Sequence, residues 1–278
     1  MALYDPVDGV YRKVNKSYDP VEGTHRKVIK AYDDVEGVYR QYFGDNLNAG
    51  GLAVGDSVWI KVNNIDHEFL VVHQGNPNSA KYDASCDGTW LLMKDIYTKM
   101  KWSSTNNNYK ISEILGYGGI FLTYLDSVVQ SAIKQVKIPY WDGPGALGYV
   151  ASGDKGLSTK IFQLSLYEVG LTTGVIASIP AEGSVLDYFD TGVAENVNSK
   201  RIANFEGKAD NWWLRSPYAH IDYNQQISDF HYQYAWYVSQ SSVCSTTNAL
   251  DYSFGFRPAF IIDRDTPIDQ STGKNIIE

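Results

Sequence analysis

The segment from residue 218 to residue 254 constrains the fold most, because its composition suits a surface while its flanks suit an interior. It contains no Lys, Arg, Glu, Gly, Pro or Met, whereas Tyr, Ser, Asn, Asp, His, Phe and Thr are plentiful. Tyrosine offers a large amphipathic contact area at low entropic cost, and Ser and Asn offer adaptable hydrogen bonds. The flanks, NWWLRSP at 211–217 and GFRPAF at 255–260, mix aromatic residues with one arginine and one proline. The sequence therefore predicts a binding surface held between two structural segments.

Three further motifs precede these flanks: VGDSV at 54–58, SCDGTWLL at 85–92 and KQVKIPY at 134–140. Together with WWLRSP and GFRPA, they resemble a C-type-lectin-like domain of gut bacteria and their phages, over roughly residues 50 to 265. Some members of that family are variable proteins of diversity-generating retroelements, in which adenine-directed mutagenesis rewrites codons of a ligand-binding surface. The resemblance implies an α+β fold, β-rich with short helices. It also implies a non-enzymatic, receptor-binding function directed at a bacterial surface protein or glycan.

The genetic code provides an internal test of diversification. An asparagine codon mutated at its adenines can become Tyr, Ser, Asp, His, Phe, Ile, Ala, Thr, Cys or Leu, but not Gln, Trp, Lys, Glu or Met. Most of the segment fits the first set. If the mechanism applies, the residues that do not fit are fixed scaffold: Gln225, Gln226, Gln233, Trp236 and Gln240. The alternative is an ordinary polar and aromatic β region on a domain surface.

The ligand is expected on a shallow face built from residues 218–234 and 241–253, with tyrosines as anchors and smaller polar residues as selectors. The predicted ligand-binding residues are Tyr218, His220, Asp222, Tyr223, His231, Tyr232, Tyr234, Ser241, Ser242, Asn248, Asp251 and Tyr252. The predicted structural motif residues are Trp212, Trp213, Arg215, Arg257 and Phe260.

Residues 1–43 hold three copies of a 14-residue repeat, beginning at Tyr4, Tyr18 and Tyr32. Each copy places an acidic–glycine pair before an alternating stretch, which predicts a tight turn feeding a short strand. Because so short a unit cannot bury a core, the repeats are expected to pack on one another, on the main domain or on another subunit. Similar repeats occur at the front of phage tail and head-decoration proteins, which implies attachment to a phage particle protein or self-association. The alternative is a mobile basic arm.

The rest of the chain is predicted to follow in three parts. Residues 44–53 are glycine-rich and predict a linker, residues 54–265 predict the ligand-binding domain, and residues 266–278 predict a C-terminal tail.

Charge and cysteine usage exclude some partners. The net charge is -8, and binding to nucleic-acid phosphates needs clustered positive charge, so no nucleic-acid partner is expected. The two cysteines, Cys86 and Cys244, are expected to be free thiols. The first residues lack the basic and apolar regions of a signal peptide, and no apolar run approaches the ~20 residues of a membrane span. The expectation is a protein assembled in the host cytoplasm and carried on the virion, at the phage tail or head, without membrane insertion.

Local patterns predict the elements of the main domain. Residues 56–62 and 67–73, joined by an Asn-Asn pair, predict a β-hairpin, and residues 89–93 predict a buried segment that residues 95–100 continue as a short helix. Helix caps are predicted at Ser112 and at Asp126 or Ser127. The five glycines of residues 141–156 predict a long loop. The remaining predicted strands are 160–166, 234–238 and 243–250.

Two other functions fit parts of the pattern. One is a structural head or tail decoration module without an external ligand. The other follows from the lectin-like fold, which is shared with formylglycine-generating enzymes and so suggests an oxidase. Those enzymes bind copper through a cysteine pair that is close in sequence, whereas Cys86 and Cys244 are far apart. No catalytic residue, metal ligand or cofactor is predicted.

Overall fold

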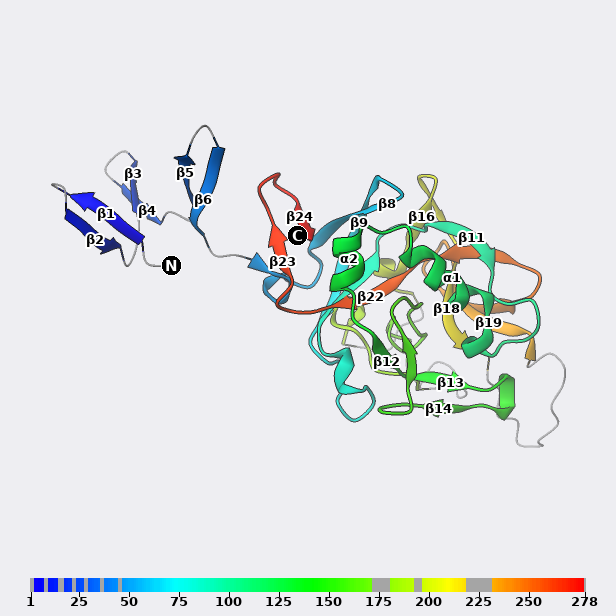
Figure 1. The fold of residues 1–278 in the computed structure, drawn as a ribbon. Helices are drawn as coiled ribbons and strands as arrows, with labels where there is room; N and C mark the ends of the chain where they lie inside the picture. The colour runs from blue at the N-terminus through cyan, green and yellow to red at the C-terminus, as the bar shows by residue number, and fades with distance from the viewer. Residues whose placement is uncertain are drawn as a thin grey trace. The chain divides into compact units, whose positions relative to one another are not determined.

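The structure, a computed structural model, divides the chain into two compact units, Met1–Leu47 and Asn48–Glu278 (Figure 1). Up to residue 46, and at Ala146, it describes the backbone alone. The described residues are 3–7, 10–14, 18–21, 24–27, 30–35, 38–44, 47–171, 181–192, 197–218 and 232–277.

Each N-terminal repeat is one antiparallel β-hairpin. In every copy the two strands are separated by two residues, at the position of the acidic–glycine pair. The register also repeats, since it places Asp5 opposite Arg12, Asp19 opposite Arg26 and Asp33 opposite Arg40. The hairpins remain three separate two-stranded sheets. They are β1 (Leu3–Val7) with β2 (Val10–Val14), β3 (Tyr18–Val21) with β4 (Thr24–Lys27), and β5 (Lys30–Val35) with β6 (Val38–Gly44).

A seven-stranded sheet forms one end of the main unit. Its predicted hairpin is confirmed: two strands pair across Asn63 and Asn64, whose φ angles of 50° and 65° suit the tight turns that join twisted strands. β10 is buried at all five residues between β9 and β22. The strands, in sheet order, are β22 (Ala259–Ile262), β10 (Thr89–Met93), β9 (Ile65–Gln74), β8 (Ser57–Val62), β24 (Asn275–Ile277), β23 (Pro267–Asp269) and β7 (Leu47–Asn48).

Two boundary predictions need correction at this sheet. Residues 266–278 are not a tail, because β24 pairs in parallel with β8 and buries Ile277. The predicted linker at 44–53 also ends early. Ala49 and Leu52 are buried, and the Ala49 N–H donates to the Thr266 carbonyl at 2.9 Å. Backbone pairing between distant segments thus brings both into the main unit.

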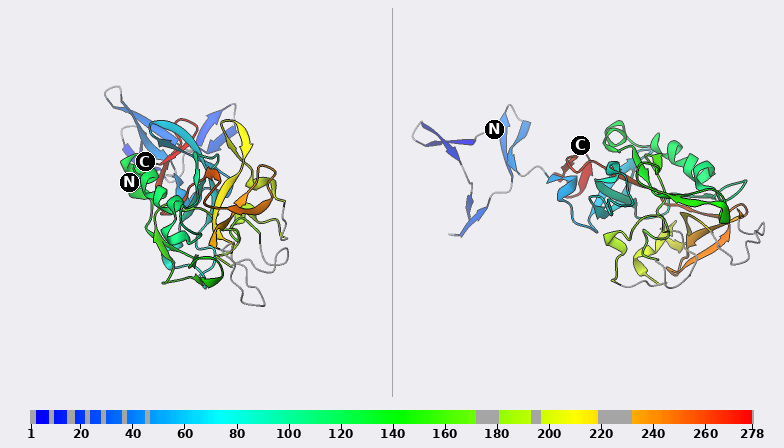
Figure 2. Two further views of the ribbon diagram at one scale, coloured as in Figure 1. Left: turned by 90° about the vertical axis from the view of Figure 1, so that its right-hand side faces the viewer. Right: turned by 90° about the horizontal axis from the view of Figure 1, so that it is seen from below.

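A five-stranded sheet forms the other end of the main unit, as the right-hand view of Figure 2 also shows. Its centre is β18 (Trp212–Pro217), the WWLRSP segment, which is buried at all six residues. β18 pairs antiparallel with β19 and in parallel with β21. The predicted pairing of β19 with β20 is confirmed. The other strands are β11 (Thr98–Lys101), β21 (Ser253–Phe256), β19 (Tyr234–Val238) and β20 (Cys244–Asn248).

Two short α-helices follow β11 in the sequence and precede β12 (Val136–Ile138). α1 (Glu113–Leu122) begins after Ser112, whose side chain accepts from the Leu115 N–H as the cap prediction requires. α2 (Ser127–Ala132) follows Asp126 without a side-chain capping bond. Within the part of the chain that the structure describes, neither helix nor any other is long and apolar enough to cross a membrane. The fold is therefore α+β and mostly β.

Small two-stranded sheets complete the main unit and correct the loop prediction for residues 141–156. That segment contains a hairpin of β13 (Tyr140–Asp142) and β14 (Tyr149–Ala151), seen at the lower edge of Figure 1. The other pairs are β12 (Val136–Ile138) with β15 (Leu157–Thr159), and β16 (Ala203–Phe205) with β17 (Lys208–Asp210).

Two element types were predicted wrongly. Residues 95–100 do not form a helix, because Thr98–Lys101 pairs with β21 as an edge strand. Residues 160–166 do not form a strand. They make one isolated β-bridge, between Phe162 and Ala259 of β22. This apolar run is nevertheless buried, which shows that a short hydrophobic run fixes burial more reliably than backbone conformation.

Deletion of residues 1–43 is expected to leave the melting temperature of the main unit nearly unchanged, because β7 and the whole seven-stranded sheet remain. Thermal unfolding followed by circular dichroism measures this. As a control, deletion of residues 267–278 removes β23 and β24 and should lower the melting temperature. A shortened chain that fails to fold without the repeats would contradict the division into two units.

Candidate functional site

Eight of the predicted ligand-binding residues belong to the part of the chain that the structure describes. They are Tyr218, Tyr232, Tyr234, Ser241, Ser242, Asn248, Asp251 and Tyr252. The other four, His220, Asp222, Tyr223 and His231, lie outside the described residues.

Most of the described site residues meet at one end of the β19–β20 hairpin. Tyr234 lies opposite Asn248 in the register, and the Tyr218 N–H donates to the Tyr234 carbonyl at 2.8 Å. The Asn248 side chain donates to Asp251 Oδ2 at 2.7 Å. Tyr252 follows directly and is 52% exposed. We call this group, with Tyr232, the tyrosine surface.

The two serines do not belong to the tyrosine surface. Ser241 and Ser242 form the turn at the other end of the hairpin, four residue pairs away, or roughly 13 Å along a strand. Ser242 is also buried, with 2% of its surface exposed and a φ of 68°. Its N–H donates to the Ser239 carbonyl, so it shapes the turn. The prediction of one continuous face that includes Ser242 is therefore wrong.

Asn107, which the sequence analysis missed, holds the base of the tyrosine surface. Its side-chain amide donates to the carbonyls of Tyr234 at 2.7 Å and Tyr218 at 3.4 Å, and its backbone N–H donates to the Tyr232 carbonyl at 2.8 Å. Its side-chain oxygen accepts from the Gly145 N–H at 2.9 Å. Asn107 is fully buried. One residue thus fixes both chain ends that flank residues 219–231, and no local pattern in the Asn-rich stretch 106–108 distinguishes it.

Other aromatic rings pack against the rings of the tyrosine surface. The Tyr252 ring centroid lies 5.8 Å from Phe254, and Phe254 lies 4.8 Å from Trp213 of the WWLRSP segment. The Tyr218 ring lies 6.4 Å from Trp236, which is 3% exposed. Aromatic pairs at these separations attract one another beyond their buried area. The half-buried Tyr218 ring and the exposed Tyr252 ring are thus connected, through aromatic contacts, to the buried Trp236 and Trp213.

A buried ion pair fixes the central strand, β18. Arg215 and Glu168 are both fully buried, and the guanidinium donates to both carboxylate oxygens, at 2.6 and 2.7 Å. The remaining guanidinium N–H groups donate to the carbonyls of Pro139, Gln163 and Glu182. Burial by itself lowers the pKa of Arg215, but the adjacent Glu168 carboxylate outweighs burial and raises it. All five N–H donors of the arginine are thereby satisfied.

Glu182 extends this network to the β13–β14 hairpin. Its carboxylate accepts from the Trp141 N–H at 2.6 Å and from the Ser216 hydroxyl. Burial raises the pKa of Glu182, although the Arg215 charge opposes the shift. The motif residues Trp212, Trp213, Arg215, Arg257 and Phe260 are all buried, as a structural role requires.

A known family covers this whole arrangement. A family described as a domain of unknown function, DUF6273, matches residues 87–264. The chain belongs to the DUF6273 family. Comparison with curated proteins gives no match, and comparison with solved structures gives none either. The DUF6273 segment contains Asn107, the Arg215–Glu168 pair and the tyrosine surface.

The two cysteine thiols are poorly suited to act as nucleophiles or metal ligands, because both roles require the thiolate. Cys244, within the DUF6273 segment, and Cys86, just before it, are both free and buried. Burial raises the pKa of Cys86 to about 12 and that of Cys244 to about 11, so both are protonated at neutral pH. Among the residues that the structure describes, no group of three or more His, Cys, Asp or Glu is placed to hold a metal ion.

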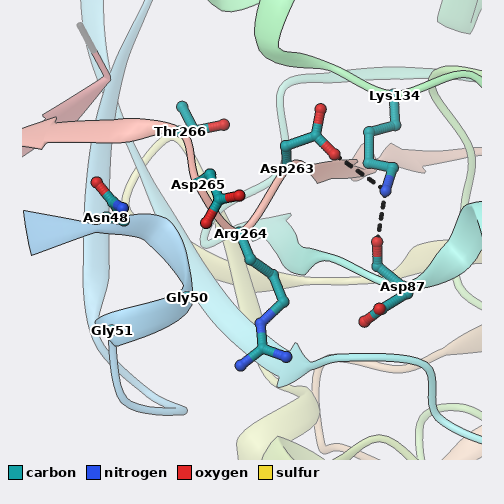
Figure 3. A pocket seen from close by; sticks show the side chains of 9 residues that line it. All are labelled: Asn48, Gly50, Gly51, Asp87, Lys134, Asp263, Arg264, Asp265 and Thr266. Carbon is teal, nitrogen blue, oxygen red and sulfur yellow. Dashed lines mark hydrogen bonds and ion pairs between the residues drawn. The ribbon is translucent and has the colours of Figure 1, made fainter.

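A polar pocket of about 820 Å³ lies at the seven-stranded end of the main unit, at the end away from β18–β20 (Figures 1 and 3). Figure 3 shows the Lys134 ammonium between the Asp87 carbonyl, at 2.6 Å, and the Asp263 carboxylate, at 3.0 Å. The lining also carries Arg264 and Asp265. Two cationic and three carboxylate side chains line this pocket. Because charges of both signs are present in similar number, the lining does not indicate whether a ligand would be an anion or a cation.

Replacement of Arg215 by methionine should destabilise the protein by about 3–5 kcal/mol, because it leaves the Glu168 carboxylate buried without its partner. Chemical denaturation measures the loss. Arg264→Met is the matched control, since Arg264 is exposed and its loss should change the unfolding free energy by less than about 0.5 kcal/mol. Equal effects of the two substitutions would contradict a structural role for the ion pair.

Asn107→Leu should loosen the tyrosine surface without unfolding the sheets. The Gly145 N–H loses its acceptor, which costs about 1–3 kcal/mol for a buried group left unpaired, and the carbonyls of Tyr218 and Tyr234 each lose one donor. Amide hydrogen exchange should become at least about tenfold faster at Gly145 and Tyr218. The Val71 amide, bonded to the Asp56 carbonyl, is the internal control. Uniform acceleration at all three amides would indicate global destabilisation instead.

Proposed function

We propose that the main unit is a non-enzymatic ligand-binding domain with a C-type lectin fold, and that the tyrosine surface is its binding site. The observation that carries the proposal is the Asn107 clamp. Asn107 gathers Tyr218, Tyr232 and Tyr234 at one end of the β19–β20 hairpin through three hydrogen bonds. Binding loops held by a rigid scaffold are the usual way in which proteins display recognition residues.

The chemistry of the tyrosine surface supports recognition rather than catalysis. It combines aromatic rings with Asn and Asp side chains, the combination that antibody paratopes use. Two buried, protonated thiols give no support to the alternative of a formylglycine-generating-enzyme-like oxidase. The α+β, mostly β architecture, with WWLRSP as a central buried strand, is compatible with the lectin-like fold.

Diversification of this surface is part of the proposal. Three described residues, Gln233, Trp236 and Gln240, cannot arise from an asparagine codon by mutation at adenines. Of these, Trp236 has a buried side chain, which supports a fixed scaffold position for it. The discriminating genomic observation is a reverse transcriptase gene nearby, with a near-copy of the 211–260 coding segment that carries adenines at the differing positions. Without that copy, the surface is an ordinary fixed one.

The protein is proposed to act as a phage-encoded receptor-binding protein on the virion, directed at bacterial surface ligands. Two-stranded hairpins are marginally stable alone, so the three repeats need a partner, either a phage particle protein or other copies of the chain. Several binding domains on one platform gain avidity. Deletion of residues 1–43 should then abolish self-association or particle incorporation. The alternative is a structural decoration module without an external ligand.

The double substitution of Tyr232 and Tyr252 by alanine should remove most binding, because a few aromatic residues usually dominate interface energy. Binding of the full chain to a panel of fixed gut bacteria, measured by flow cytometry, and to a printed glycan array provides the readout. Tyr124→Ala is the control, since Tyr124 is half-buried beside Tyr97 on another part of the unit. Full binding by the double variant would refute the tyrosine surface as the site.

A further inference from the structure

The third N-terminal hairpin, β5–β6, is the longest of the three. β5 has six residues and β6 has seven, whereas each strand of the other two hairpins has four or five. Each hairpin is a sheet of its own, so both of its strands have an outer edge that no other strand of the described residues covers. The backbone N–H and C=O groups of such an edge are available to an added strand.

The register shows which backbone groups point to these outer edges. The two residues that close a two-residue turn form a hydrogen-bonded pair, and successive pairs along an antiparallel ladder then alternate between hydrogen-bonded and non-hydrogen-bonded. In β5–β6 the closing pair is Val35 with Val38. The next pair, Asp34 with Tyr39, is therefore a non-hydrogen-bonded one. The N–H groups of these two residues point away from the hairpin, each toward one outer edge.

Proline closes one outer edge in each of the first two hairpins. Pro6 of β1 and Pro20 of β3 hold the register position that Asp34 holds in β5, one pair from the turn. Proline has no N–H, and at this position the missing donor belongs to the outer edge, so the hairpin itself loses no hydrogen bond. An added strand would find one donor fewer there. Asp34 leaves the corresponding edge of β5 complete.

The opposite strand differs in the same sense. Lys13 of β2 and Lys27 of β4 lie opposite the first tyrosine of their repeats, and Gln41 of β6 holds this position in the third hairpin. The pair is again a non-hydrogen-bonded one, so the backbone groups of these residues belong to the outer edge. Lysine and proline on edge strands are two of the means by which proteins prevent edge-to-edge pairing. The first two hairpins have both, and the third has neither.

We infer that β5–β6 is an assembly site and that its partner is the β5–β6 hairpin of a second copy of this chain. The inference rests on the proposed role of the repeats in attachment or self-association, and it commits that role to self-association through one hairpin. β6 of one copy pairs antiparallel with β5 of the next, so the sheet continues from copy to copy. Because this pairing is head-to-tail, each assembly keeps one free edge of each kind and more than two copies can join.

Charge favours the pairing of unlike strands. β5 carries two aspartates, Asp33 and Asp34, against one lysine, whereas the only charged residue of β6 is Arg40. Pairing either strand with a second copy of itself would bring like charges together, which destabilises a sheet. In the register that extends the hairpin's own pairing, Arg40 of one copy lies opposite Asp33 of the next. The added strands also relieve the marginal stability of a sheet of two strands.

The test is analytical ultracentrifugation of the full-length chain over a concentration series. Wild type should form assemblies larger than a dimer, and Asp34→Pro should raise the dissociation constant at least about tenfold. The third hairpin should tolerate this proline, because Pro6 and Pro20 hold the same register position in the other two. Asp34→Asn is the matched control. It keeps the N–H group and removes one exposed charge, so it should change the dissociation constant by less than about threefold.

A transplant variant tests the edge mechanism by a gain of association. Pro20→Asp combined with Lys27→Gln gives the second hairpin the two edge residues of the third. In the Asp34→Pro chain, this pair of substitutions should restore assembly.

Loss of association in Asp34→Pro but not in Asp34→Asn, with recovery in the transplant variant, supports the inference. It is overturned if assembly stops at the dimer, if Asp34→Pro assembles as wild type does, or if the transplant restores nothing. A full-length chain that stays monomeric also overturns it and leaves a phage particle protein as the proposed partner of the repeats. Association that persists in Asp34→Pro but is lost on deletion of residues 1–43 rejects the inference while the proposed role of the repeats survives. Association that persists after that deletion rejects both.

Discussion

The bidentate pair of Arg215 and Glu168 is the interaction on which the rest of the main unit depends. It is fully buried, and its two residues lie 47 positions apart in sequence. Through the carbonyls of Pro139, Gln163 and Glu182, the same guanidinium holds the chain segments around the central strand β18. A buried charge pair of this kind contributes little net stability compared with apolar packing, but breaking it is costly. It therefore fixes which segments meet at the centre of the domain.

Arg257 shows a second way to bury a guanidinium. Its Nε donates to the Met93 carbonyl at 2.8 Å, and its charge lies 4.7 Å from the centre of the Trp212 ring. Burial lowers the pKa of Arg257 to about 10, which still leaves it charged at neutral pH. The arginine of GFRPAF thus stacks on the first tryptophan of WWLRSP. The two motifs that flank the 218–254 segment are joined by this contact and by the pairing of β21 with β18.

The buried interior of this domain and the tyrosine surface differ in the types of residue that form them. Large buried rings and charged groups form the interior, and Asn107 attaches the tyrosine surface to it through hydrogen bonds to the backbone carbonyls of the tyrosines. Backbone contacts are indifferent to side-chain identity. A surface held in this way can change its side chains without losing its attachment, which is the property that a diversified binding site needs.

The sequence by itself determined the features that depend on neighbouring residues. The 14-residue repeats, the β8–β9 hairpin with its Asn-Asn turn, the Ser112 cap and the burial of WWLRSP all follow from local pattern or composition. Only the tertiary structure decided the contacts between distant segments. These include the C-terminal strands in the seven-stranded sheet, the strand at Thr98–Lys101, the buried turn position of Ser242 and the clamp at Asn107. The physical reason is that a strand edge or a buried amide is defined by the partner that satisfies its hydrogen bonds, and that partner lies far away in sequence.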